Sequence, residues 1–156
     1  MTSDDVLNLY NELEKLGITI WIDGGWCVDA LIGHQTRQHD DLDIAIKRND
    51  NEKLKSFFES SSYNDENRPD STDWNYVKRK GNEKIDVHVC DFDDVGNNIY
   101  GVKYPIDSLN GMGVINNKNV RCISPEWMFK FKTSYTPKGK DSKDIEALSL
   151  KFGFKQ

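Results

Sequence analysis

The chain has 156 residues, of which 30% are charged and 37% hydrophobic, and its formal net charge is −5 at pH 7. This length suits one compact domain over residues 1–156, in which roughly two-thirds of the unfolded chain's surface is buried. The negative charge argues against a nucleic-acid partner, because binding a phosphate backbone usually calls for a basic surface. No apolar run approaches about 18 residues, so we expect no membrane span.

The N-terminus and the cysteines both indicate a cytoplasmic protein. The first residues, MTSDDV, lack the basic and apolar regions of a signal peptide. Cys27, Cys90 and Cys122 are odd in number, lie far apart and lack metal-ligand spacing, which is typical of buried reduced thiols. We expect a monomer or a homodimer.

The chain begins with a helix followed by a strand. Apolar residues recur at helical spacing over residues 6–16, and Ser3 or Asp4 can cap the start of this helix. Isoleucine then alternates with threonine, tryptophan and aspartate over residues 18–23, the period-two pattern of a half-buried strand.

A glycine pair, Gly24 and Gly25, turns the chain from this strand into a short helix expected over residues 26–32. Glycines at a helix start let the backbone approach a phosphate, whose charge is favoured by the free N–H groups and the helix dipole. Gly33 suits the residue just beyond the helix end. The pair therefore predicts a phosphate-binding turn.

A second strand is expected over residues 41–46. Leu42, Ile44 and Ile46 form its apolar face, so Asp41 and Asp43 point together from the other face, about 6.6 Å apart along a regular strand. Two like charges on one face disfavour folding unless a positive charge lies between them. A divalent cation is the obvious candidate.

A third carboxylate belongs to the strand that contains Asp86 and His88. Both lie opposite the apolar face of that strand, and pairing beside the strand of Asp41 and Asp43 would bring Asp86 within about 4.5–5.5 Å of one aspartate. Carboxylates on adjacent strands suit one or two Mg²⁺ ions, which complete their coordination with water and substrate phosphates. We therefore expect a magnesium site made by Asp41, Asp43 and Asp86.

The remaining elements are a helix from Asn49 or Asp50 to about residue 60, a polar loop over 61–73, and a hairpin that joins a strand over 75–79 to the Asp86 strand. Further short strands are expected over 99–104 and 114–123, with an asparagine-rich turn over 116–119. Ser124 and Pro125 begin a helix that extends to Tyr135, and another helix follows Lys138.

The string from Trp21 to Ala30, WIDGGWCVDA, together with TRQHDDLD over residues 36–43, resembles the DNA-polymerase-β-like nucleotidyltransferase superfamily. It is most similar to the small antibiotic nucleotidyltransferases, which comprise the lincosamide enzymes and the aminoglycoside 2″-adenylyltransferases. The resemblance implies an α/β (α+β) fold, with a small mixed sheet and helices packed mainly on one side.

The resemblance also implies a reaction. A nucleoside monophosphate, most simply AMP from ATP, would pass to a hydroxyl of a small molecule such as a lincosamide or an aminoglycoside, with release of pyrophosphate. Asp41 and Asp43 would hold the Mg²⁺ of the nucleoside triphosphate. Asp86 would bind a second Mg²⁺ or accept the hydroxyl proton, and these two roles stay open at this point.

Three cationic side chains are candidates for the triphosphate, each with a structural alternative. Arg37 can bind phosphate bidentately or pair with Asp40 or Asp29. Lys132 matches in position a triphosphate ligand of the resembling enzymes, or it is simply favoured near a helix C-terminus by the dipole. Lys140, near a helix start, either binds an anion or pairs with a neighbouring aspartate.

Other positions and other functions remain open. Asp29 either holds a loop donor or contacts the acceptor, and His39 either orders the aspartates or is solvated. The acidic stretch 91–94 is either a solvated strand end or a rim that attracts an amine. The rival functions are nucleotidylation of a protein hydroxyl, as in toxin–antitoxin relatives, and a non-catalytic nucleotide-binding domain.

Overall fold

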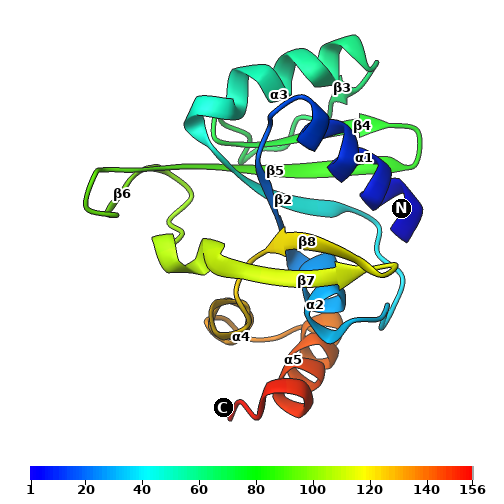
Figure 1. Ribbon diagram of the computed structural model, residues 1–156, viewed down its shortest axis with the longest axis vertical. Helices are drawn as coiled ribbons and strands as arrows, with labels where there is room; N and C mark the ends of the chain where they lie inside the picture. Colours follow the sequence, from blue (N-terminus) through cyan, green and yellow to red (C-terminus); the bar gives the residue numbers. More distant parts are fainter. Residues whose placement is uncertain (156) are drawn as a thin grey trace.

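The computed structural model describes residues 1–155, which form a mixed α/β structure built on one twisted sheet (Figure 1). Its elements are α1 (Ser3–Lys15), β1 (Ile20–Asp23), α2 (Gly24–Ile32), β2 (Leu42–Lys47), α3 (Arg48–Ser60), β3 (Asn64–Asp65), β4 (Asn75–Lys80), β5 (Glu83–Phe92), β6 (Asn98–Gly101), the 3-10 helix η1 (Ile106–Asn110), β7 (Gly111–Ile115), β8 (Lys118–Cys122), α4 (Pro125–Thr133) and α5 (Gly139–Phe152). Within these residues no helix is long and apolar enough to cross a membrane.

The eight strands form a single sheet in the order β3-β4-β5-β2-β1-β8-β7, with β6 paired to β5 outside this path. The central strands β2 and β5 run parallel, as do β1 and β8, whereas β1 and β2 are antiparallel. The sheet is therefore mixed, and the predicted α/β class is confirmed.

The register of the sheet separates an apolar face from a polar one. Tyr76, Val87, Ile44, Ile22 and Cys122 are successive partners across five strands, so their side chains share one face. The helix α3 meets this face through a hydrogen bond between its Asn51 and Tyr76, and α2 meets it through contact between Cys27 and Cys122. The core lies here, and the opposite face is left for polar side chains.

Three helix starts differ from the sequence prediction. The helix α3 begins at Arg48, just before the predicted Asn49 or Asp50. In the other two a side chain upstream satisfies free N–H groups. The cap of α1 is Thr2, not Ser3 or Asp4: its hydroxyl accepts from the amide of Asp5, whose carboxylate accepts from the amide of Thr2. The helix α2 begins at Gly24, because the carboxylate of Asp23 accepts from the Gly24 amide at 2.7 Å.

The strand boundaries are close to those predicted. The hairpin β7–β8 turns at Asn116 and Asn117, whose φ angles of 46° and 64° are the left-handed values that asparagine tolerates. β2 begins at Leu42, so Asp41 lies just outside the strand that was expected to include it. The loop between α3 and β4 also contains the two-residue strand β3, which pairs with β4.

Candidate active site

Three aspartates lie side by side on the polar face of the sheet. Asp23 of β1 pairs in register with Asp43 of β2, and Asp43 pairs with Asp86 of β5. The predicted neighbourhood of Asp43 and Asp86 is thus confirmed. Asp23, which was not expected to take part, joins them because it is the last residue of β1 and directly precedes the glycine pair.

The glycine pair is required by close packing against this row. Gly24 has a φ of 60°, and a β-carbon there would collide with the carboxylate of Asp43. A β-carbon on Gly25 would collide with the ring of His39 and with the guanidinium of Arg37. The start of α2 therefore lies directly against the carboxylates, as a phosphate-binding turn beside a metal site requires.

His88 and Tyr104 tie the aspartates together. The Nε2 atom of His88 lies 3.3 Å from Asp86, its Nδ1 atom lies 3.1 Å from the hydroxyl of Tyr104, and that hydroxyl donates to Asp23 at 2.5 Å. Burial disfavours a charged imidazole, but Asp23 and Asp86 outweigh it and raise the pKa of His88 to about 10. At neutral pH His88 is therefore a cation in this cluster.

Asp43 has the opposite character. Burial, followed by the charges of Asp23 and Asp41, raises its pKa to about 7. Asp43 thus lies where negative charge is in excess, and a bound cation would relieve that excess. The carboxylates of Asp43 and Asp86 and the ring of His88 each offer an atom within 4.8 Å of the others.

This donor set fits a magnesium ion. Carboxylate oxygens are the ligands that Mg²⁺ prefers, and within this group Asp43 and Asp86 supply them. Asp41 is not part of the group, although it is close enough to influence Asp43. Its predicted role as a ligand stays a prediction.

Asp86 has a further partner that the sequence did not indicate. Arg68, from the loop before β4, donates to both carboxylate oxygens of Asp86, with distances of 2.6 and 3.3 Å. Burial alone would raise the pKa of Asp86, but the hydrogen bonds of His88 and Arg68 lower it. Asp86 is therefore an anion with two cationic neighbours.

The loop before β2 is organised by a buried aspartate of α2. One oxygen of Asp29 accepts from the amide and hydroxyl of Thr36, and the other is bonded to Nε2 of His39. The expectation that Asp29 holds a loop donor is confirmed, but the donors are Thr36 and His39 and not Arg37. His39 is buried and packs against Trp26 in a tilted arrangement, with ring centroids 4.7 Å apart. It is therefore not solvated, and its ring bonds to Asp29 and not to the metal-site aspartates.

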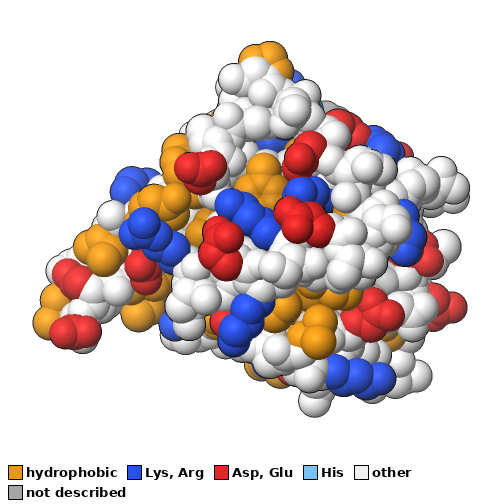
Figure 2. Space-filling view, turned by 90° about the horizontal axis from the view of Figure 1, so that it is seen from above, with side chains coloured by type: hydrophobic (Ala, Val, Ile, Leu, Met, Phe, Trp, Pro, Cys, Tyr) orange, Lys and Arg blue, Asp and Glu red, His pale blue; other side chains and the backbone are white. Residues whose placement is uncertain are grey.

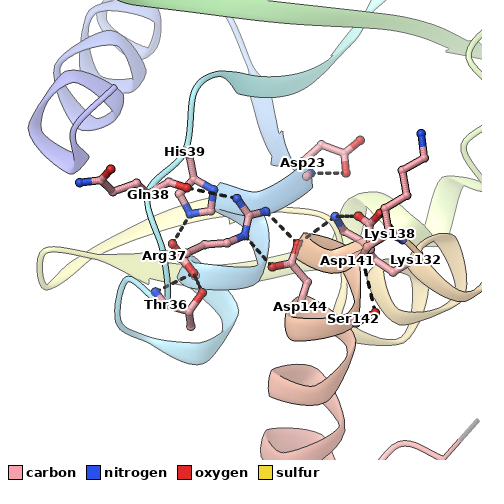
Figure 3. Close-up of polar contacts among 12 residues, drawn as sticks. Asp23, Thr36, Arg37, Gln38, His39, Lys132, Lys138, Asp141, Ser142 and Asp144 are labelled. Atoms are coloured by element: carbon pink, nitrogen blue, oxygen red, sulfur yellow. Dashed lines mark hydrogen bonds and ion pairs between the residues drawn. The ribbon is translucent and has the colours of Figure 1, made fainter.

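Arg37 and Lys132 share a buried carboxylate on α5. Nε and Nη2 of Arg37 donate to the two carboxylate oxygens of Asp144, each at 3.0 Å (Figure 3). Nζ of Lys132 lies 2.9 Å from Asp144 and 3.1 Å from Asp141. The expected alternative partners of Arg37, Asp40 and Asp29, are wrong; Asp144 takes that place. Burial disfavours the charge of Lys132, but Asp144 and Asp141 outweigh it and raise its pKa.

A cleft of about 820 Å³ opens over the carboxylates and the start of α2. It is lined by Asp23, Asp43 and His88, by the aromatic residues Trp74, Tyr104, Phe131 and Tyr135, and by the lysines Lys103, Lys132, Lys138 and Lys140. Arg37 does not line it and approaches only the Gly25 side. Seen from above, basic and acidic side chains are interspersed on the surface (Figure 2).

The acidic stretch after β5 has a local explanation. The carboxylate of Asp93 accepts from the amides of Val95 and Asn97 and from the side chain of Asn97, so it stabilises the turn that leads to β6. The carboxylate of Asp91 accepts from the amide of Phe92. These bonds show a turn-forming role for Asp93, whereas Asp91 belongs to β5 and pairs with Tyr100 of β6.

The paired carboxylates, the glycine turn and the cationic cleft define a nucleotidyltransferase, and comparison with known proteins gives its family. The sequence profile of the aminoglycoside-2″-adenylyltransferase family matches residues 5–148, and the chain belongs to this family of enzymes. The chain is 28% identical over 156 residues to a lincosamide resistance protein of Staphylococcus haemolyticus, covering 95% of this chain and 94% of that protein. It is also 26% identical over 141 residues to a 2″-aminoglycoside nucleotidyltransferase of Klebsiella pneumoniae, covering 88% and 78%.

Solved structures show the same fold. The lincomycin-bound crystal structure of a lincosamide antibiotic adenylyltransferase superposes with a TM-score of 0.81 at 24% identity, covering 96% of this chain and 97% of that one. An aminoglycoside 2″-nucleotidyltransferase in complex with adenylyl-2″-tobramycin gives a TM-score of 0.74 at 22% identity, covering 96% and 89%.

Proposed function

We propose that this enzyme transfers AMP from ATP to a hydroxyl of a small antibiotic in a Mg²⁺-dependent reaction that releases pyrophosphate. The observation that carries the proposal is the row of Asp23, Asp43 and Asp86 directly beside the Gly24–Gly25 turn, with Asp23, Asp43 and Gly24 lining one cleft. Family membership supports the reaction class.

In this proposal the chain's own residues bind and orient the nucleotide. Asp43 and the nearby Asp41 would hold Mg²⁺, which when bound would neutralise charge on the triphosphate. The amides at the start of α2 and the lysines Lys132 and Lys140 face the phosphates. Arg37, beside Gly25, contributes to the same positive field.

The acceptor side of the reaction requires a proton acceptor. The hydroxyl oxygen forms a bond to the α-phosphorus, the bond from that phosphorus to the pyrophosphate oxygen breaks, and the hydroxyl proton passes to a carboxylate of the enzyme. We assign this proton to Asp86, which lies on β5 beside Asp43 and is the carboxylate of the pair that remains when Asp43 holds Mg²⁺.

The acceptor class follows from the relatives and from the cleft. The two curated relatives are a lincosamide resistance protein and an aminoglycoside nucleotidyltransferase. The aromatic side chains of Trp74, Tyr104 and Phe131 offer apolar surface on which the ring of a small acceptor can pack. A cleft of about 820 Å³ lies in the range of small-molecule sites.

The test is incubation of the protein with Mg²⁺ and α-labelled ATP against a panel of lincosamides and aminoglycosides. Transfer of label to a drug, with an equal amount of pyrophosphate released, is the expected result. Asp43→Asn serves as the inactive control. Label that appears on protein instead would favour nucleotidylation of a protein hydroxyl, and nucleotide binding without any transfer would favour a non-catalytic domain.

A further inference from the structure

Arg68 is the feature of this site that the proposed reaction does not explain. It comes from the loop between β3 and β4, and its guanidinium covers Asp86, which is only 7% exposed. Asp86 does not line the cleft, although Asp43 and His88 do. A cation of the chain thus lies on the carboxylate that a second Mg²⁺ would bind.

The guanidinium is held from several sides. Its Nη1 and Nη2 atoms donate to the two oxygens of Asp86 at 2.6 and 3.3 Å, and Nη2 also donates to the side-chain oxygen of Asn75 at 3.2 Å. Nε lies 3.3 Å from a carboxylate oxygen of Asp70. Two parallel N–H···O bonds fix both the position and the orientation of a carboxylate.

The loop that carries Arg68 is itself tied to the sheet. The amide of Arg68 donates to the hydroxyl of Ser71, the amide of Ser71 donates back to the carbonyl of Arg68, and the side-chain amide of Asn75 donates to the carbonyl of Asp70. These three hydrogen bonds restrain the loop and therefore favour a fixed position for the guanidinium of Arg68.

We propose that Arg68 is a positioning residue that holds Asp86 as the proton acceptor and occupies the place of a second divalent cation. The enzyme then works with one Mg²⁺, bound on the Asp43 side. The inference rests on the proposed function. Arg68 acts through Asp86, since its contacts are to Asp86, Asn75, Asp70 and Ser71 and it does not line the cleft.

The first test counts bound ions and needs no turnover. Mn²⁺ binding is measured by electron paramagnetic resonance in the presence of a non-hydrolysable ATP analogue. The wild-type chain should bind one ion, whereas Arg68→Gln, which frees Asp86, should bind two. Two ions in the wild type would overturn the proposal, and so would a single ion in both proteins.

The second test separates kcat from KM. Arg68→Gln should lower kcat by about 10–100-fold, the usual size of a supporting-residue effect, with KM for ATP changed less than about twofold. High Mg²⁺ should restore part of kcat, because an ion can then take the place of the guanidinium. Arg68→Lys, which keeps the charge and loses the fork, should fall between the wild type and Arg68→Gln.

Arg79→Gln is the matched control. Arg79 belongs to the neighbouring strand β4 and pairs with Glu66 instead of Asp86, so its loss should change neither ion number nor kcat. A wild-type rate in Arg68→Gln, or a faster one, would refute the positioning role and identify Arg68 as dispensable or inhibitory. If the wild type transfers no label, the ion count still decides the role of Arg68 while the proposed function fails separately.

Discussion

Replacing Asp144 with alanine should strongly destabilise the protein. Asp144 is 1% exposed and pairs with Arg37 and Lys132, whose side chains are 20% and 11% exposed. Removing one partner of a buried ion pair leaves an uncompensated charge and typically costs about 3–5 kcal/mol. Lys132 keeps Asp141, and Arg37 can regain some water, so we expect the lower end, about 3 kcal/mol.

Urea unfolding followed by tryptophan fluorescence measures this loss. With a slope of about 2 kcal/mol per molar urea, a loss of about 3 kcal/mol lowers the unfolding midpoint by about 1.5 M. Glu146→Ala is the matched control: Glu146 is exposed on the same helix, so its removal should change stability by no more than about 0.5 kcal/mol.

A double variant tests whether the stability lost in Asp144→Ala comes from the uncompensated charge of Arg37. Combining Asp144→Leu with Arg37→Met removes both charges of the pair, and apolar replacement of a buried pair is often neutral or stabilising. We expect this double variant to be more stable than Asp144→Ala. A midpoint for Asp144→Ala within the range of Glu146→Ala would refute the reasoning, because the pair would then be worth no more than a surface ion pair.

Three further predictions concern the carboxylates and the nucleotide. In the metal-free protein, Asp43→Asn should raise the melting temperature more at pH 8 than at pH 5. The folded-state pKa of Asp43 is raised from 3.8 to about 7, so the wild type loses stability as pH rises from about 4 to about 7, and asparagine, which cannot ionise, does not. An equal shift at both pH values would contradict this. Gly24→Ala should abolish transfer because its methyl group would displace Asp43, while Gly139→Ala, with open space around it, should retain activity in the same assay. Mg²⁺ and ATP together should raise the melting temperature more than the sum of either alone, since each supplies ligands to the other, and strictly additive shifts in a thermal scan would argue for nucleotide binding without a shared metal.

Periodicity predicts the central sheet because the relevant signals are local. Alternation around Asp43 and around Asp86 fixes which face each side chain points to, and an apolar face on both strands favours pairing them in the core. The structure pairs Asp43 with Asp86 as that reasoning requires. The glycine pair is also a local signal, since it indicates a close approach to the start of α2. In the structure the group that approaches Gly24 is the carboxylate of Asp43.

Asp23 could have been found by the same rule. It ends the first alternating segment, and the apolar residue before it, Ile22, faces the core, so Asp23 has to point to the polar face. Its position beside Asp43 depends on the antiparallel pairing of β1 with β2. A short helix and loop between two strands permit that pairing but do not demand it, because the same pattern is compatible with a parallel crossover.

The ion pairs that complete the site have no local signal at all. Arg37 and Asp144 are 107 residues apart in the chain, and their meeting depends on α5 packing against α2. Several carboxylates lie closer to Arg37 in the chain than Asp144 does. One of them, Asp29, bonds to Thr36 and His39 instead. Because Asp29 is already bonded to Thr36 and His39, the guanidinium of Arg37 pairs with a carboxylate of α5, which also binds Lys132. The same helix thus fixes the positions of Arg37 and Lys132, so a substitution of Asp144, which does not line the cleft, can change the proposed nucleotide site.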